Sequence, residues 1–169
     1  MTEPPSSESR SVLFVCLGNI CRSPMAEGVF RHLVEETGET HLWRIDSAGT
    51  GDWHIGDRAD PRARQVAAER GVSLDSRARQ VTAEDFRTFD LVLAMDDSNR
   101  TDLESVREGV GENATAELRL FREFDPEAGD DLDVPDPYFG GPDGFVEVFD
   151  LVERTCRRLL DEGLDRRPG

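Results

Sequence analysis

Four short runs along the chain have the character of strands. Aliphatic or aromatic residues recur in each of them, and polar or glycine residues follow. Runs of this length are typical of strands buried in a parallel sheet. They span residues 11–16, 43–47, 90–94 and 116–121.

Helical patterns occupy the segments between and after these runs. Ser23 is expected to cap the first helix, with Pro24 in its first turn, and Gly38 ends it. The last helix has the broadest apolar stripe, which includes Phe145, Val152 and Cys156. Thr82 followed by Asp85 suggests a short capped helix. The other predicted helices span residues 61–70, 98–107 and 144–163.

The alternation of strands and helices predicts a single α/β domain over residues 11–165. Its core is a four-stranded parallel sheet flanked by helices on both faces, the doubly wound arrangement. In such sheets, ligands bind beyond the carboxyl ends of the strands. Residues 1–10, MTEPPSSESR, are expected to be a disordered leader.

The charge balance narrows the range of partners. The chain has 36 acidic residues against 20 basic ones, all of them arginine, for a net charge of −16. Such a surface repels nucleic acid and anionic lipid, so neither is expected as a partner. We interpret the acidity as a halophilic adaptation to a salty cytoplasm, where repulsion is screened. The alternative is an acidic patch that recruits a basic partner.

Other bulk features favour a cytoplasmic protein without a metal or cofactor. No apolar run approaches the roughly 18 residues of a membrane span, and the start lacks a secretory signal. The three cysteines do not form a disulfide framework. The three histidines are scattered, with no spacing typical of a zinc site.

The segment CLGNICRSP joins the first strand to the first helix and has the character of an anion site. Backbone N–H groups of such a curl converge on a concave centre, beside the positive end of the helix dipole. Gly18 and Asn19 are the residues best suited to left-handed backbone angles. The planar guanidinium of Arg22 can bind two phosphate oxygens at once.

The same surroundings favour Cys16 as a thiolate nucleophile, and Ser23 could donate a hydrogen bond to its sulfur. The segment is not a nucleotide-binding loop, because it lacks the glycine and lysine spacing of that motif. The structural alternative is a buried cysteine at a strand end, a surface arginine and an ordinary turn. The apolar strand before the loop and the helix start after it favour the functional interpretation.

If the phosphate bound by this loop belongs to a phosphotyrosine, the leaving group is a phenol with a pKa of about 10. Its oxygen then needs a proton as the bond to phosphorus breaks. The acidic segment VPDPYFGGPDG holds Asp136 between two prolines. From the residues alone, Asp133 remains an alternative general acid.

Four segments in order resemble the low-molecular-weight protein tyrosine phosphatases, and the resemblance covers nearly the whole chain. It implies the phosphotyrosine phosphatase I-like fold and phosphotyrosine hydrolysis without a cofactor. It assigns Cys16 as nucleophile, Arg22 as phosphate ligand and Asp136 as general acid. The segments are Val15–Pro24, Asp46–Thr50, Met95–Asn99 and Asp136–Tyr138.

The resemblance also implies a pocket for phosphotyrosine proteins, or for inorganic phosphate and other oxyanions in the loop. Trp53 and Tyr138 are expected to form aromatic walls, whereas His54 is expected to be a loop residue. Ser76 stands where the family often has a histidine that braces Asn19, which puts the rigidity of the loop in doubt. The expected substrate-binding residues are Leu17, Gly18, Asn19, Ile20, Cys21, Ser23, Trp53 and Tyr138.

Three rival functions remain open. Thioredoxin-coupled arsenate reductases resemble the chain but need further cysteines, and none lies between Cys21 and Cys156. Protein-arginine phosphatases resemble it too, but tend to carry Thr where Ile20 stands. A non-catalytic phosphopeptide-binding module would use the same loop. Cys21 is also a candidate for a reversible disulfide with Cys16 under peroxide.

Overall fold

A parallel four-stranded sheet forms the centre of the molecule in the computed structural model, which describes residues 9–138 and 140–165. The strand order is β2-β1-β3-β4, so the predicted fold class is confirmed. The strands are β1 (Arg10–Cys16), β2 (Trp43–Gly49), β3 (Leu91–Ala94) and β4 (Glu117–Leu120). Both faces of β1 are covered, because all residues from Ser11 to Cys16 are buried.

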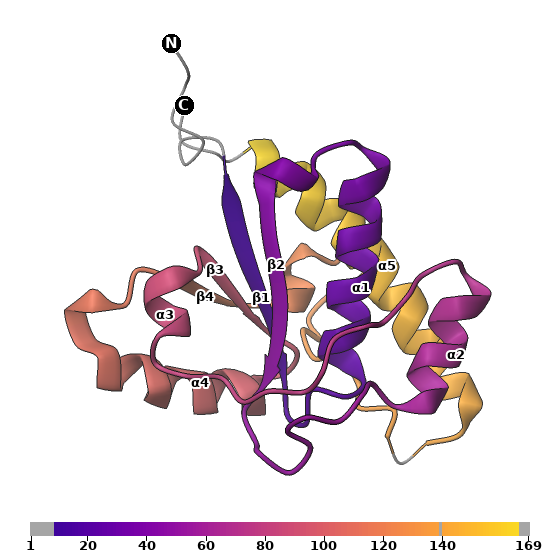
Figure 1. Cartoon of the computed structure of the whole chain (residues 1–169), viewed down its shortest axis with the longest axis horizontal. Coiled ribbons are helices and arrows are strands. Elements are labelled where there is room, and N and C mark those ends of the chain that lie inside the picture. The colour runs from indigo at the N-terminus through magenta and orange to yellow at the C-terminus, as the bar shows by residue number, and fades with distance from the viewer. Residues whose placement is uncertain (1–8, 139, 166–169) are drawn as a thin grey trace.

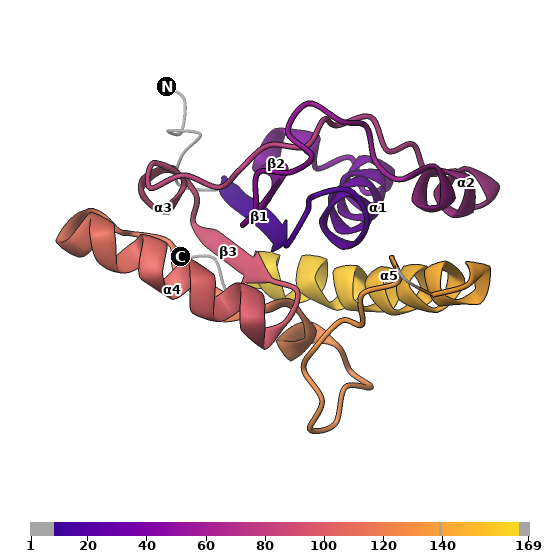
Figure 2. The same cartoon turned by 90° about the horizontal axis from the view of Figure 1, so that it is seen from below.

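Helices cover the two faces of the sheet in separate layers (Figures 1 and 2). One layer holds α1 (Arg22–Glu36), α2 (Pro61–Glu69) and α5 (Pro142–Asp165). The other holds α3 (Asp85–Thr88) and α4 (Asp97–Val110). Alternate residues of β1 supply the two cores: Phe14 packs with the first layer and Leu13 with the second.

The larger core lies between the sheet, α1 and α5. The rings of Phe30 and Phe121 both meet Phe14 edge to face, with centroids 5.8 and 5.7 Å away. The predicted apolar stripe of α5 is buried here, and Cys156 is fully enclosed. These contacts fix α1, and therefore the loop that precedes it, against the sheet.

The topology places the cysteine loop at a switch point. From β1 the chain passes through α1 to β2 on one side, whereas β3 lies on the other side. The carboxyl ends of β1 and β3 are adjacent, because Val15 pairs with Ala94. Loops that follow these strands therefore meet at one edge of the sheet, as expected for a ligand site in this class of fold.

Several element boundaries differ from the sequence prediction. Helix α1 begins at Arg22, and its N-cap position is Cys21 without a side-chain cap. The expected Ser23 cap is therefore wrong, because the Ser23 hydroxyl faces Cys16. Asp90 precedes β3 and accepts hydrogen bonds from Ser11. Asp96 caps α4 through the N–H of Asn99.

At the start of the chain, β1 includes Arg10, which the predicted leader contained. The rest of that leader, up to residue 8, lies outside the described residues. Within the described ranges, no helix has the length and apolar character needed to cross a membrane.

Candidate active site

The backbone of the loop between β1 and α1 turns its N–H groups inward. The carbonyl oxygens of Cys16, Leu17 and Ile20 accept hydrogen bonds from backbone groups of two neighbouring segments. In a trans peptide, the carbonyl and the following N–H point in opposite directions, and no cis bond occurs in the described chain. The N–H groups of residues 17, 18 and 21 therefore point toward the centre of the loop, where an anion would bind.

Asn19 holds the curl in place. Its φ of 58° is the only positive value among the described residues other than glycine. The side-chain amide donates to Ser23 Oγ at 2.8 Å and to Ser47 Oγ at 3.0 Å, and its oxygen accepts from Arg79 N at 3.0 Å. Ser47 in turn donates to the buried Glu27 carboxylate at 2.5 Å. The hydrogen bonds that hold Asn19 thus come from Ser23, Ser47 and Arg79, and Ser76 is not among their partners in the described structure.

The end of β2 must approach the loop closely for this network to form. An added Cβ at Gly49 would lie 2.7 Å from the carbonyl oxygen of Leu17. Only glycine at this position lets Ser47 and the loop residue Asn19 come within hydrogen-bond distance.

A hydroxyl and a backbone N–H converge on the sulfur of Cys16. Ser23 Oγ lies 3.0 Å from it and the N–H of Asn19 lies 3.3 Å from it. Cys16 itself is only 2% exposed. A sulfur held at a helix N-terminus beside such groups is suited to carry negative charge and to act as a nucleophile.

Arg22 is a buried cation held from the back. Its Nη1 donates to Asp96 Oδ2 at 2.7 Å and to the carbonyl of Val134 at 3.0 Å. Burial opposes its charge, but Cys16 and the hydrogen bond to Asp96 raise the pKa of Arg22 above its ordinary value. The guanidinium therefore stays charged, and Asp96 fixes its plane beside the loop.

The structure separates the two candidate acids. The Asp133 carboxylate accepts a hydrogen bond from Asp97 N at 2.9 Å, at the start of α4. Asp136 instead lines the pocket, with Oδ2 3.7 Å from Arg22 Nη2 and Oδ1 bound to the N–H of Tyr138. Asp136 is therefore the carboxyl placed to face a ligand in the loop.

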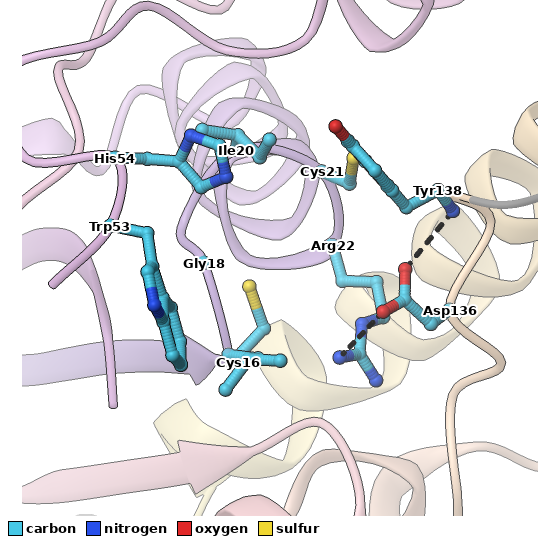
Figure 3. A pocket seen from close by; sticks show the side chains of 10 residues that line it. Cys16, Gly18, Ile20, Cys21, Arg22, Trp53, His54, Asp136 and Tyr138 are labelled. Atoms are coloured by element: carbon cyan, nitrogen blue, oxygen red, sulfur yellow. Dashed lines mark hydrogen bonds and ion pairs between the residues drawn. The ribbon is translucent and has the colours of Figure 1, made fainter. Parts of the chain in front are cut away.

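The pocket above the loop is open to solvent, has mainly apolar walls and a volume of about 170 Å³. In Figure 3 the sulfur of Cys16 points into the space between Trp53 on one side and Asp136 and Tyr138 on the other. Trp53 is 70% exposed, and its ring lies so close over Gly51 that a Cβ there would clash. The remaining lining residues are Leu17, Gly18, Ile20, Cys21, Arg22 and His54.

Comparisons with known proteins agree with this geometry. The family model described as "Low molecular weight phosphotyrosine protein phosphatase" matches residues 11–167. The chain belongs to this family. A relative in Streptomyces coelicolor, a low molecular weight protein-tyrosine-phosphatase, is 52% identical over 150 residues, or 88% of this chain and 90% of the relative. The protein is therefore an enzyme of the protein tyrosine phosphatase class, as predicted.

Solved structures of related phosphatases share the fold. The protein tyrosine phosphatase of Entamoeba histolytica is 37% identical, with a TM-score of 0.85 over 95% of this chain and 99% of that one. A Drosophila arginine phosphatase is 34% identical, also with a TM-score of 0.85, over 90% of this chain and 96% of that one. The fold is thus equally similar to a tyrosine phosphatase and to an arginine phosphatase, so fold similarity does not decide between phosphotyrosine and phosphoarginine as the substrate.

The other two cysteines of this phosphatase have different surroundings. Burial, with Asp60, Cys16 and Asp136 nearby, raises the pKa of Cys21, so this thiol is neutral near neutral pH. Cys156 is fully buried on α5, and burial raises its pKa well above the ordinary value. All three cysteines are free, so a disulfide between Cys16 and Cys21 stays a prediction.

Two groups of the phosphatase site had no role in the sequence interpretation. Asp96 lay in a segment quoted only for its resemblance, although it caps a helix and binds Arg22. Glu27 and Ser47 brace Asn19 from α1 and β2. In the described residues, no group of three or more His, Cys, Asp or Glu side chains is arranged to hold a metal ion.

Proposed function

We propose that the protein hydrolyses phosphotyrosine in proteins through a cysteinyl-phosphate intermediate, with Cys16, Arg22 and Asp136 as the catalytic residues. The observation that supports this most is their convergence on one pocket from three separate elements. The nucleophile is the last residue of β1, the arginine begins α1, and the carboxyl lies on the loop before α5.

In the first step, the Cys16 thiolate attacks phosphorus and the bond from phosphorus to the phenol oxygen breaks. Arg22 and the inward N–H groups of the loop stabilise the charge on the equatorial oxygens. Asp136 gives its proton to the departing phenol oxygen, so the tyrosine side chain leaves neutral.

In the second step, Asp136 is a carboxylate and takes a proton from an attacking water. The new bond from oxygen to phosphorus forms as the bond from sulfur to phosphorus breaks, which releases inorganic phosphate and restores the thiolate. The Ser23 hydroxyl, 3.0 Å from the sulfur, stabilises that thiolate as it leaves. The positive Arg22 retains the phosphoryl group throughout.

The shape of the pocket supports an aromatic phosphomonoester as substrate. Trp53 and Tyr138 border it, with Leu17 and Ile20 as further apolar lining. A tyrosine ring is flat and long enough to pass between such walls, whereas a phosphoserine side chain is too short to bring its phosphate to the loop. Substrate binding is thus assigned to the loop residues 17–23 together with the two aromatic side chains.

Phosphoarginine is the second candidate substrate, because the structural relatives include an arginine phosphatase. The side chain of Ile20 argues against it. This residue is apolar, 9% exposed and part of the pocket lining. A charged guanidinium leaving group would lose its hydration against such a side chain without gaining a hydrogen bond.

The two other rivals are less well supported by the site. An arsenate reductase needs a second reactive thiol, but Cys156 is enclosed in the core and Cys21 is a neutral, buried thiol. A phosphopeptide-binding module has no use for a proton donor such as Asp136 opposite the loop.

One experiment separates these functions. Phosphate release from phosphotyrosine and phosphoarginine peptides is measured for the wild type, Cys16→Ser and Asp136→Asn. We expect turnover of phosphotyrosine that Cys16→Ser abolishes and that Asp136→Asn lowers by about 100-fold or more, the usual size of a general-acid effect. Activity that survives Cys16→Ser would end the proposal, and tight peptide binding without turnover would identify a binding module.

A further inference from the structure

An unusual pair of arginines lies beside the pocket. Arg58 and Arg77 face each other in an isolated antiparallel bridge between two irregular segments. Residues directly opposed in such a pair have Cβ atoms about 4.5–5.5 Å apart, and like charges there repel each other. Both residues are exposed, so the two cations share one patch of surface.

The carboxylates of the same region have other partners in the structure. Asp57 pairs with His54 at 3.1 Å, Asp60 pairs with Arg62 at 2.9 Å, and Asp75 accepts from the Ser73 hydroxyl. Among the residues that the structure describes, neither Arg58 nor Arg77 forms an ion pair.

The remaining contact of Arg77 ties the pair to the rim of the pocket. Its Nη1 donates to the carbonyl of Gly56 at 3.3 Å. Gly56 follows the pocket residues Trp53 and His54, and the backbone of Asp57 bonds back to His54. In Figure 1 this segment runs below the carboxyl ends of β1 and β2 on its way to α2.

Exposed apolar side chains collect at the same rim. Within the described chain, the large apolar residues that are exposed are Leu17, Trp53, Ile55 and Tyr138. Three of them line the pocket, and Ile55 lies between Trp53 and the arginine pair in the sequence. Apolar side chains gathered in this way mark a contact surface rather than chance exposure.

We infer that the Arg58–Arg77 surface binds acidic side chains that flank phosphotyrosine in the protein substrate. This inference rests on the proposed function and names its substrate class. A net charge of −16 repels acidic segments in general. Two arginines without an ion pair in the described structure, linked to the segment of Trp53 and His54 through the carbonyl of Gly56, offset that repulsion locally and accept carboxylates in the bidentate geometry that guanidinium groups favour.

The test compares three phosphotyrosine peptides of equal length whose flanking residues are acidic, neutral or basic. Values of kcat/KM are measured for the wild type and for Arg58→Gln/Arg77→Gln at the lowest salt that keeps the fold. We expect the wild type to favour the acidic peptide and the double variant to lose about 3- to 10-fold on it, mainly in KM, the size expected for two exposed ion pairs. Activity on the neutral peptide stays within twofold.

A matched variant controls for the change in net charge. Arg87→Gln/Arg107→Gln removes two arginines from α3 and α4, on the opposite face of the sheet. It is expected to keep the acidic preference. The charge reversal Arg58→Glu/Arg77→Glu is expected to shift the preference to the basic peptide, and added salt should weaken both preferences.

The outcomes distinguish the two levels of the proposal. No hydrolysis of any phosphotyrosine peptide would overturn the proposed function itself. Turnover of all three peptides with equal efficiency, or an equal loss in the two double glutamine variants, would overturn the arginine surface and leave the phosphatase intact. Circular dichroism of each variant verifies that the fold is retained.

Discussion

At the residue scale, Asp96 shows how much of the site lies outside the three residues proposed to be catalytic. It binds Arg22 at 2.7 Å with one oxygen and caps α4 with the other. Asparagine is also a good helix cap, so Asp96→Asn removes the charge and leaves the cap. We expect kcat/KM for a phosphotyrosine peptide to fall about tenfold, since a hydrogen bond to a charged group contributes roughly 1.5–3 kcal/mol.

The matched control is the neighbouring Asp97→Asn. Asp97 is exposed and pairs with the half-buried Arg100 rather than with the site. Its replacement is expected to change kcat/KM by less than twofold, because exposed ion pairs contribute little. Equal effects of the two variants would show that Asp96 contributes only one negative charge to the region and does not act by holding Arg22.

The brace of Asn19 provides a second prediction. Ser47→Ala leaves the Asn19 amide and the buried Glu27 oxygen each short of a partner. We expect a loss of about 1–3 kcal/mol in the free energy of unfolding, measured by urea denaturation, together with a lower kcat. Ser76→Ala is the control and should leave both unchanged. A large effect at Ser76 would mean that this residue takes over the role of the missing histidine.

The sequence predicts Cys16, Arg22 and Asp136 as site residues because each type stands in a recognisable local setting, and all three line one pocket in the structure. The contact between Arg22 and Asp96 could not be predicted, because 74 positions separate the two residues. The rigidity of the loop around Asn19 could not be judged from Ser76 for the same reason. Ser47 and the backbone of Arg79 reach Asn19 from distant segments that only the folded sheet brings together.

At the scale of elements, the loop that carries Asp136 is fixed by an ionic anchor. Asp125 lies at its start with a fully buried side chain, and it accepts hydrogen bonds from Arg122 and Arg154. Arg122 also donates to the carbonyl of Asp133 at 2.8 Å, while Val134 N binds the carbonyl of Met95. The loop that carries Asp136 is therefore held by α5, the segment after β4 and the end of β3.

This anchor predicts a sensitivity to acid. Burial opposes the charge of Asp125, but the hydrogen bonds to Arg154 and Arg122 lower its pKa below the ordinary value near 3.9. A carboxylate with a lowered folded pKa contributes stability that is complete above its unfolded pKa and is lost as the pH falls toward the folded pKa. Melting temperatures from pH 7 to pH 3 should therefore fall below about pH 4.

The variant Asp125→Asn isolates that contribution. At pH 7 it is expected to lose about 3 kcal/mol, because two arginines are left without their carboxylate in a largely buried site. Its stability should then fall less steeply than that of the wild type as the pH drops below 4. If the stability of the two proteins falls equally steeply below pH 4, Asp125 does not contribute to the loss of stability in acid.

Most elements could be predicted from their apolar pattern, as in α5, whose buried apolar positions repeat every three to four residues. The first nine residues of α1 are instead all buried, because the helix starts inside the site. The ends of the elements could not be predicted. Helix α1 begins one residue before the predicted cap because the Ser23 hydroxyl is used in the site. Strand β3 starts after Asp90 because that carboxylate binds Ser11 of the neighbouring strand. Contacts from elsewhere in the fold decide where regular structure stops.

At the scale of the whole molecule, net charge could be predicted from composition, whereas its distribution could not. Many arginines form ion pairs with nearby carboxylates, such as Arg100 with Glu104 and Arg158 with Glu162. The excess negative charge therefore lies on exposed acidic side chains for which the described structure shows no ion pair. These include Asp102, Glu108, Glu112 and Glu147.

Repulsion among these carboxylates predicts that stability depends on salt. The Debye length falls from about 30 Å at 0.01 M to about 10 Å at 0.1 M, so added KCl should raise the melting temperature over this range. A variant with Asp102→Asn, Glu108→Gln, Glu112→Gln and Glu147→Gln should melt higher at low salt and respond less to KCl. We attribute a rise over this range to screening of that repulsion. A melting temperature that is unchanged or rises when salt is removed would sink the proposed adaptation to a salty cytoplasm, and would leave recruitment of a basic partner as the better account of the acidic surface.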